Sequence, residues 1–169
     1  MQPLQLSDGV FHMWLPVKEF LSGEVFFLEA DPETTITEPG STTYSMTVAY
    51  YNGIDNSIDI NSGRGYTRDG YIKPDFAAPG VGVTGAIPGG RFATRTGSSV
   101  AVGLTGGASA LMAEWLVREQ ELNLGAGASE VRNLFVLGAQ QKPLLDYPNR
   151  QWGYGTLDVY QSLDRLRRL

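Results

Sequence analysis

The run of small and apolar residues at positions 100–116 constrains the fold most strongly. Only Thr105, Ser109, Glu114 and three glycines interrupt it, and we expect one helix over residues 99–117. These interruptions predict the buried helix of a soluble protein rather than a membrane span. A helix that is apolar over most of its surface needs a sheet or other helices around it, which favours a layered architecture.

The segments before this helix have the patterns of strands and loops. Residues 45–51 form a nearly continuous apolar and β-branched run, which is typical of a strand buried on both faces in a parallel sheet. Shorter runs predict strands over residues 10–15, 24–28 and 81–86. Prolines bracket residues 73–80, which we expect to form a loop.

Two further helices are expected after residue 117. The first runs from a cap at Ser129 to Gly138, with apolar residues at helical spacing. The second starts near Thr156 and is expected to bury four side chains: Leu157, Tyr160, Leu163 and Leu166. Strands followed by alternating loops and helices predict an α/β fold.

The charge and cysteine content exclude several classes of function. The chain has 13 basic and 18 acidic residues, a formal net charge of −5 and no basic stripe, so we expect no nucleic-acid partner. The cluster of Arg165, Arg167 and Arg168 fits a solvated helix end, which the helix dipole favours. The absence of cysteine excludes disulfides, zinc–thiolate sites and thiol catalysis.

Residues 80–85 match the dinucleotide-binding pattern G-x-G-x-x-G but lack its context. That pattern must lead directly into a helix whose N-terminus meets the pyrophosphate. Pro79 precedes the first glycine and Pro88 follows the last, so no helix begins there. We identify no cofactor-binding motif in the chain.

The sequence Gly97-Ser98-Ser99-Val100 opens the helix expected at 99–117. Backbone N–H groups in the first turn of a helix have no intrahelical acceptor, and together with the helix dipole they stabilise negative charge. A serine placed there has two interpretations. It is a nucleophile beside an oxyanion site, or it is a helix cap that accepts one of those N–H groups. The local sequence alone favours the cap.

An ordered series of motifs resembles the C-terminal part of the subtilisin-like serine proteases. Their usual text is K-P-D-x-x-A-P-G, then G-T-S-M-A, then a G-A-x-A-L helix, with an I-T-V-G-A strand and an S-x-R-G loop upstream. The matching segments here are residues 73–80, 97–101, 106–111, 46–49 and 62–65. Several linked motifs in the right order are far more specific than one motif.

Other segments are similar to the subtilases of clostridia and related gut bacteria, a group that includes the spore-germination proteases. These segments are residues 62–68, 110–115 and 147–158. Members carry a jelly-roll insertion upstream of the serine. The resemblance therefore implies that residues 31–169 are the C-terminal part of a doubly wound, mostly parallel sheet with packed helices. Residues 1–30 would be a β-rich segment at the end of such an insertion.

The resemblance implies roles for four residues. Ser99 matches the nucleophile, and its backbone N–H matches one oxyanion donor. Gly97, Ser98 and Val100 match the supporting positions, although Ser98 stands for the usual threonine and Val100 for the usual methionine.

The family's other two catalytic motifs are missing from the chain. The aspartate normally lies in D-T-G or D-S-G and the histidine in H-G-T, and neither motif occurs. The one histidine, His12, lies in a strand pattern and is expected to be structural. Without a base, a serine hydroxyl is a poor nucleophile. We therefore expect the chain to be inert alone and to depend on Asp and His from upstream residues that it does not contain.

Three readings of the function remain open from the sequence. The first is the serine side of an endopeptidase, with a peptide or protein substrate and the N-terminal part of the domain as partner. The second is a non-catalytic signalling or scaffold protein of subtilase ancestry, and the third is a binding module. By resemblance we expect an extracellular or spore-associated protein. The chain has no D-x-D-x-[DN]-G calcium loop, and the resemblance leaves calcium binding by the full-length protein open. An isolated C-terminal part would expose a sheet edge and apolar helix faces, so we expect oligomers or strand exchange of the chain alone.

Overall fold

The computed structural model describes residues 11–16, 20–118 and 127–167. The chain divides into two compact units, Met1–Asp31 and Pro32–Leu169. In the first unit, residues 11–16 and 20–31 form no strand, so the strands expected there are absent from the described residues. An apolar run forms a strand only when a neighbour supplies the ladder of hydrogen bonds. Here the side chain of Leu28 is 93% exposed rather than packed.

The second unit is built on a short parallel sheet. Strand β1 (Val48–Tyr51) pairs in parallel with strand β2 (Phe76–Pro79). Thr156 extends the sheet through a parallel bridge to Ala77. The expectation of a loop over residues 73–80 was wrong, because Pro79 is the last residue of β2 and leaves the ladder before it intact. The parallel pairing and the helices around it confirm the α/β class.

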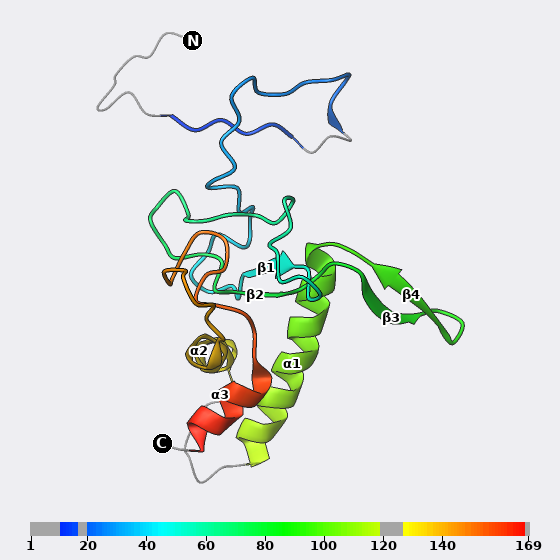
Figure 1. Ribbon diagram of the computed structural model, residues 1–169, viewed down its shortest axis with the longest axis vertical. Coiled ribbons are helices and arrows are strands. Elements are labelled where there is room, and N and C mark those ends of the chain that lie inside the picture. Colours follow the sequence, from blue (N-terminus) through cyan, green and yellow to red (C-terminus); the bar gives the residue numbers. More distant parts are fainter. Residues whose placement is uncertain (1–10, 17–19, 119–126, 168–169) are drawn as a thin grey trace. The chain divides into compact units, whose positions relative to one another are not determined.

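Three helices pack around this sheet: α1 (Ser98–Arg118), α2 (Ala128–Gly138) and α3 (Val159–Leu166). Helix α1 contacts both β1 and β2, and α2 packs against α3 (Figure 1). The largest core cluster joins β2 to all three helices. Its buried members are Phe76, Met112, Leu116, Val131, Phe135 and Leu166. Phe76 meets Phe135 edge-on, with ring centroids 5.8 Å apart.

The ends of α2 and α3 differ from the sequence expectations. Ser129 does not cap α2, because its hydroxyl donates to the Glu130 carboxylate and the N-cap is Gly127. Helix α3 starts three residues after Thr156, capped by the Asp158 carboxylate, which accepts the Gln161 N–H at 2.8 Å. Leu166 is buried as expected. Tyr160 is 73% exposed, because so short a helix buries only one stripe of side chains.

A separate antiparallel hairpin leads into α1. Its strands are β3 (Val83–Ile87) and β4 (Arg91–Arg95), joined by a turn in which Gly89 and Gly90 both have positive φ (Figure 1). The strand expected at residues 81–86 is confirmed as β3, shifted by about two residues. Strand β4 was not predicted. The G-x-G-x-x-G match at 80–85 therefore leads into a hairpin and not into a helix.

One face of α1 is not covered by the described residues. The helix is long and apolar enough to cross a membrane by length and composition, a property that core helices of soluble proteins share. Its exposed apolar side chains are Val102, Leu104, Leu111 and Val117. A Cβ added at Gly103, Gly106 or Gly107 would meet no atom within 4 Å. In the described part of the chain, no other segment therefore packs closely against these glycines.

Candidate active site at the start of helix α1

Ser98 and Ser99 lie exposed on the first turn of α1. The carbonyl of Gly97 accepts the N–H groups of Val100 at 3.1 Å and Ala101 at 3.5 Å. Neither serine hydroxyl has a hydrogen-bond partner within residues 11–16, 20–118 and 127–167. The capping interpretation therefore gains no support from the structure, and both hydroxyls are open to a ligand.

The first turn can also stabilise an anion. The backbone N–H of Ser99 has no acceptor in the part of the chain that the structure describes. It lies at the positive end of a helix of 21 residues. A free N–H beside a free hydroxyl is the arrangement that an oxyanion forming at a serine requires.

The sheet fixes the position of this turn through Gly80. The N–H of Gly80 donates to the carbonyl of Tyr51 at 2.9 Å, and the carbonyl of Gly80 accepts the N–H of Gly97 at 2.8 Å. One turn further along α1, Ala101 is buried against Ala78 and Tyr50. The turn that carries Ser99 is thus held at two points on β1 and β2.

A buried ion pair anchors the start of β2. The Lys73 Nζ lies 2.8 Å from the Asp75 Oδ2, and both side chains are almost fully buried. The Lys73 Nζ also donates to the Ser45 carbonyl at 2.6 Å, and the Asp75 Oδ2 accepts the Thr47 N–H at 2.7 Å. These hydrogen bonds join residues 45–47 to the start of β2. Each buried charge has an opposite charge and a further hydrogen-bond partner, so neither is left uncompensated.

The other motifs of the resemblance meet around the same two strands. The Ser62 hydroxyl accepts the Tyr50 N–H at 3.0 Å. The Gly65 N–H donates to the Arg150 carbonyl at 2.8 Å, and the Tyr154 N–H donates to the Asp75 carbonyl at 2.9 Å. Segments around residues 62, 75 and 150 are therefore brought together beside β1 and β2. The sequence identified these segments but gave no sign of their contacts.

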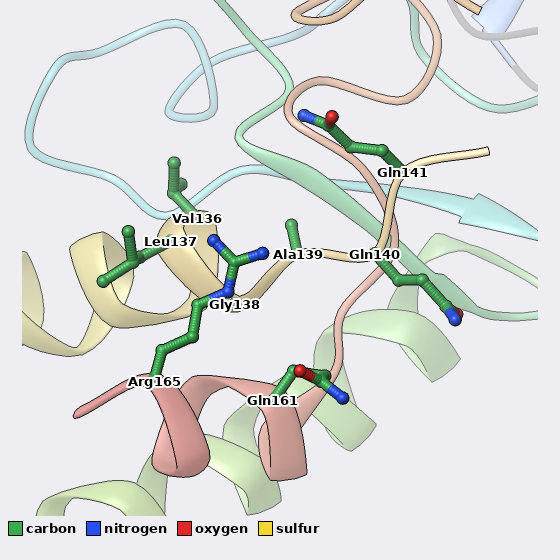
Figure 2. A pocket seen from close by; sticks show the side chains of 8 residues that line it. All are labelled: Val136, Leu137, Gly138, Ala139, Gln140, Gln141, Gln161 and Arg165. Atoms are coloured by element: carbon green, nitrogen blue, oxygen red, sulfur yellow. The ribbon is translucent and has the colours of Figure 1, made fainter. Parts of the chain in front are cut away.

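The remaining candidates lie elsewhere. His12 belongs to the first unit, where it is exposed and stacks on Trp14 with ring centroids 5.6 Å apart. Within the described ranges, no three His, Asp or Glu side chains group as a metal site. A cavity of about 260 Å³ lies between α2 and α3, and Figure 2 shows Arg165 extending across it toward Gly138 and Ala139. No residue of 97–100 lines this cavity.

Comparisons with known proteins agree with this architecture. The sequence model of the subtilase family matches residues 27–155. A search of curated proteins finds no significant match. The solved structure of the Clostridium perfringens CspB protease is 28% identical, with a TM-score of 0.77 over 84% of this chain and 31% of its own.

Two further structures, less identical in sequence, share the fold. The protease domain of PatA, as its S218A mutant, is 22% identical with a TM-score of 0.65 over 81% of this chain and 45% of its own. The prenylagaramide maturation protease PagA is 21% identical with a TM-score of 0.63 over 80% and 47%. The chain thus spans less than half the length of each of these structures. With the family model matching most of its residues, the chain belongs to the subtilase family.

Proposed function

We propose that this chain supplies the serine side of a subtilisin-like serine endopeptidase. Ser99 is the nucleophile, its backbone N–H is one oxyanion donor, and Gly97, Ser98 and Val100 hold the turn. The observation that carries the proposal is the exposed, unbonded Ser99 hydroxyl on a turn that Gly80 fixes to the sheet, in a member of the subtilase family. The substrate is a peptide or protein, and the compartment is extracellular or spore-associated by likeness to the clostridial group.

The proposed reaction is the one that a serine, a histidine and an aspartate carry out together. A histidine takes the proton from the Ser99 Oγ as that oxygen attacks the peptide carbonyl carbon, and an aspartate orients the histidine. The carbonyl oxygen becomes an oxyanion, which the Ser99 N–H and the dipole of α1 stabilise. The histidine then gives its proton to the leaving amine as the C–N bond breaks. Water hydrolyses the acyl–Ser99 ester and regenerates the hydroxyl.

The histidine and the aspartate of this reaction come from residues outside the chain. Neither family motif for them occurs in the sequence, and the chain matches only 31% of the CspB protease. In subtilisin, a protease with this triad, loss of the serine or the histidine costs about a factor of 10⁶ in kcat. The isolated chain is therefore inert, and no cofactor is assigned to it.

The partner that completes the site is the N-terminal part of the same protease domain. It covers the exposed apolar face of α1, where the side chains of Val102, Leu104, Leu111 and Val117 are 43–64% exposed. Exposed apolar surface of this kind is a feature of interfaces in soluble proteins. Without that partner, the isolated chain buries the face by forming oligomers.

Peptide hydrolysis by the complete domain tests the proposal. Ser99→Ala abolishes cleavage, whereas the control variant Ser129→Ala, an exposed serine on α2 outside this turn, keeps it. Cleavage that survives Ser99→Ala removes Ser99 as the nucleophile. A folded complete domain that cleaves nothing overturns the enzyme proposal and favours a non-catalytic scaffold.

A further inference from the structure

The segment that carries Ser99 is cationic in an otherwise acidic chain. Residues 76–113 contain no Asp or Glu, although the chain has 18 acidic residues and a net charge of −5. The same residues carry Arg91 and Arg95, so this acid-free segment has a net charge of +2. The segment that leads to Ser99 is therefore positively charged, whereas the whole chain is negatively charged.

The hairpin is fixed at its base, so Arg95 is held close to Ser99, whereas Arg91 lies at the other end of β4, beside the turn. Arg95 is the last residue of β4, four residues before Ser99, and four residues span at most about 14 Å. The base of the hairpin is closed by the Gly82 N–H, which donates to the Thr96 hydroxyl at 2.9 Å. The next residue, Gly97, is bound to Gly80. The hairpin therefore does not swing freely from the first turn of α1.

The two arginines share one face of the hairpin. In the register of the strands, Arg91 lies opposite Ile87 and Arg95 lies opposite Val83, so both side chains project on the same side. Both are exposed, and neither has an ion-pair partner among the described residues. The Arg95 Nη1 only donates to the neighbouring Thr94 carbonyl, at 3.0 Å. The face thus presents two uncompensated positive charges.

We propose that Arg91 and Arg95 select peptide substrates with acidic side chains close to the scissile bond. This proposal rests on the proposed function, because it assumes that Ser99 cleaves peptides. Charge complementarity carries it: at about 20 mM salt the Debye length is about 20 Å, so a carboxylate on a peptide bound at Ser99 is attracted by Arg95 and, more weakly, by the more distant Arg91. It meets no carboxylate from the acid-free segment itself.

Paired peptide substrates test the inference in the complete domain. The peptides differ only by Asp or Asn beside the cleaved bond, and kcat/KM is measured at about 20 mM and about 500 mM salt. We expect the wild-type domain to prefer the Asp peptide by about twofold to fivefold at low salt, the range of one exposed charge pair. High salt reduces the preference. The double variant Arg91→Glu with Arg95→Glu loses or inverts it.

The matched control is Arg165→Glu, which reverses a charge on α3 and keeps the wild-type preference. Cleavage of the Asn peptide by the double variant reports that its site is intact. Equal cleavage of both peptides by the wild-type domain, or an unchanged preference in the double variant, overturns this inference alone. If the wild-type domain cleaves neither peptide, the proposed function fails and the inference falls with it.

Discussion

Replacement of Gly80 by alanine tests the link between the sheet and the turn that carries Ser99. An added Cβ would lie 2.7 Å from the Tyr50 Cβ and 3.0 Å from the Gly97 carbonyl oxygen. Carbon atoms in contact normally lie about 3.5–4.0 Å apart. Tyr50 is only 5% exposed and packs on Ala78 and Ala101, so it has little room to move. Overpacking of this kind costs about 1–3 kcal/mol of the free energy of unfolding.

The same change displaces the site. Because the new Cβ presses on the Gly97 carbonyl, which accepts the first hydrogen bonds of α1, the Ser99 turn must shift by a few tenths of an ångström or more. Misplacement of a nucleophile by about 1 Å costs about a factor of 100 in rate, so we expect labelling by a fluorophosphonate to slow by about tenfold or more.

Two assays in the complete domain measure these effects: urea unfolding followed by tryptophan fluorescence, and the rate of fluorophosphonate labelling. The matched control is Gly85→Ala, at a position where a Cβ meets no atom within 4 Å. It leaves the labelling rate unchanged. A Gly80→Ala domain that is as stable as the wild type and is labelled at the same rate would refute the reasoning.

Three further predictions concern stability and assembly. Asp75→Asn leaves the buried Lys73 ammonium without its counter-ion, so we expect a loss of about 3–5 kcal/mol in urea unfolding, and a loss below 1 kcal/mol would contradict the pairing. Leu111→Asp on the exposed face of α1 lowers the fraction of oligomer of the isolated chain in sedimentation velocity, and an unchanged distribution would count against that face as the interface. The Asn61 N–H, followed by the Tyr50 hydroxyl, lowers the pKa of Asp59, so its stabilising effect is present above pH 3.8 and is lost as the pH falls further. Burial, followed by the Asp59 carboxylate, raises the pKa of Tyr50 above 10.0, so its effect is present below pH 10 and is lost as the pH rises. Tyr50→Phe should flatten the alkaline limb of a stability-versus-pH curve and, because it removes a hydrogen bond to Asp59, reduce the acid limb as well. An unchanged alkaline limb would contradict this assignment.

The sequence predicted the elements whose signals are local. The apolar run at 100–116 predicted a helix over residues 99–117. The observed helix α1, Ser98–Arg118, is longer by one residue at each end. The β-branched run at 45–51 contains β1, buried as expected for a parallel strand. The ordered motifs singled out Ser99, which lies exposed on the first turn of α1. Each of these features is encoded within a few neighbouring residues.

The features that the sequence did not predict depend on distant partners. Strand β4 lacks an alternating apolar pattern, because its side chains are mostly exposed and its pairing with β3 comes from the glycine turn. Residues 24–28 have the composition of a strand, but no described residue forms a ladder with them. The contact of Gly80 with Gly97 joins segments that are separated by a whole hairpin. Local patterns carry no information about such contacts.

Mass-spectrometric mapping of a fluorophosphonate adduct tests the central claim most directly. The reagent is applied to the complete domain and to the isolated chain of 169 residues. We expect a single adduct on Ser99 of the complete domain, none on Ser98, and none on the isolated chain. An adduct on another serine of the complete domain, with Ser99 unmodified, would contradict it.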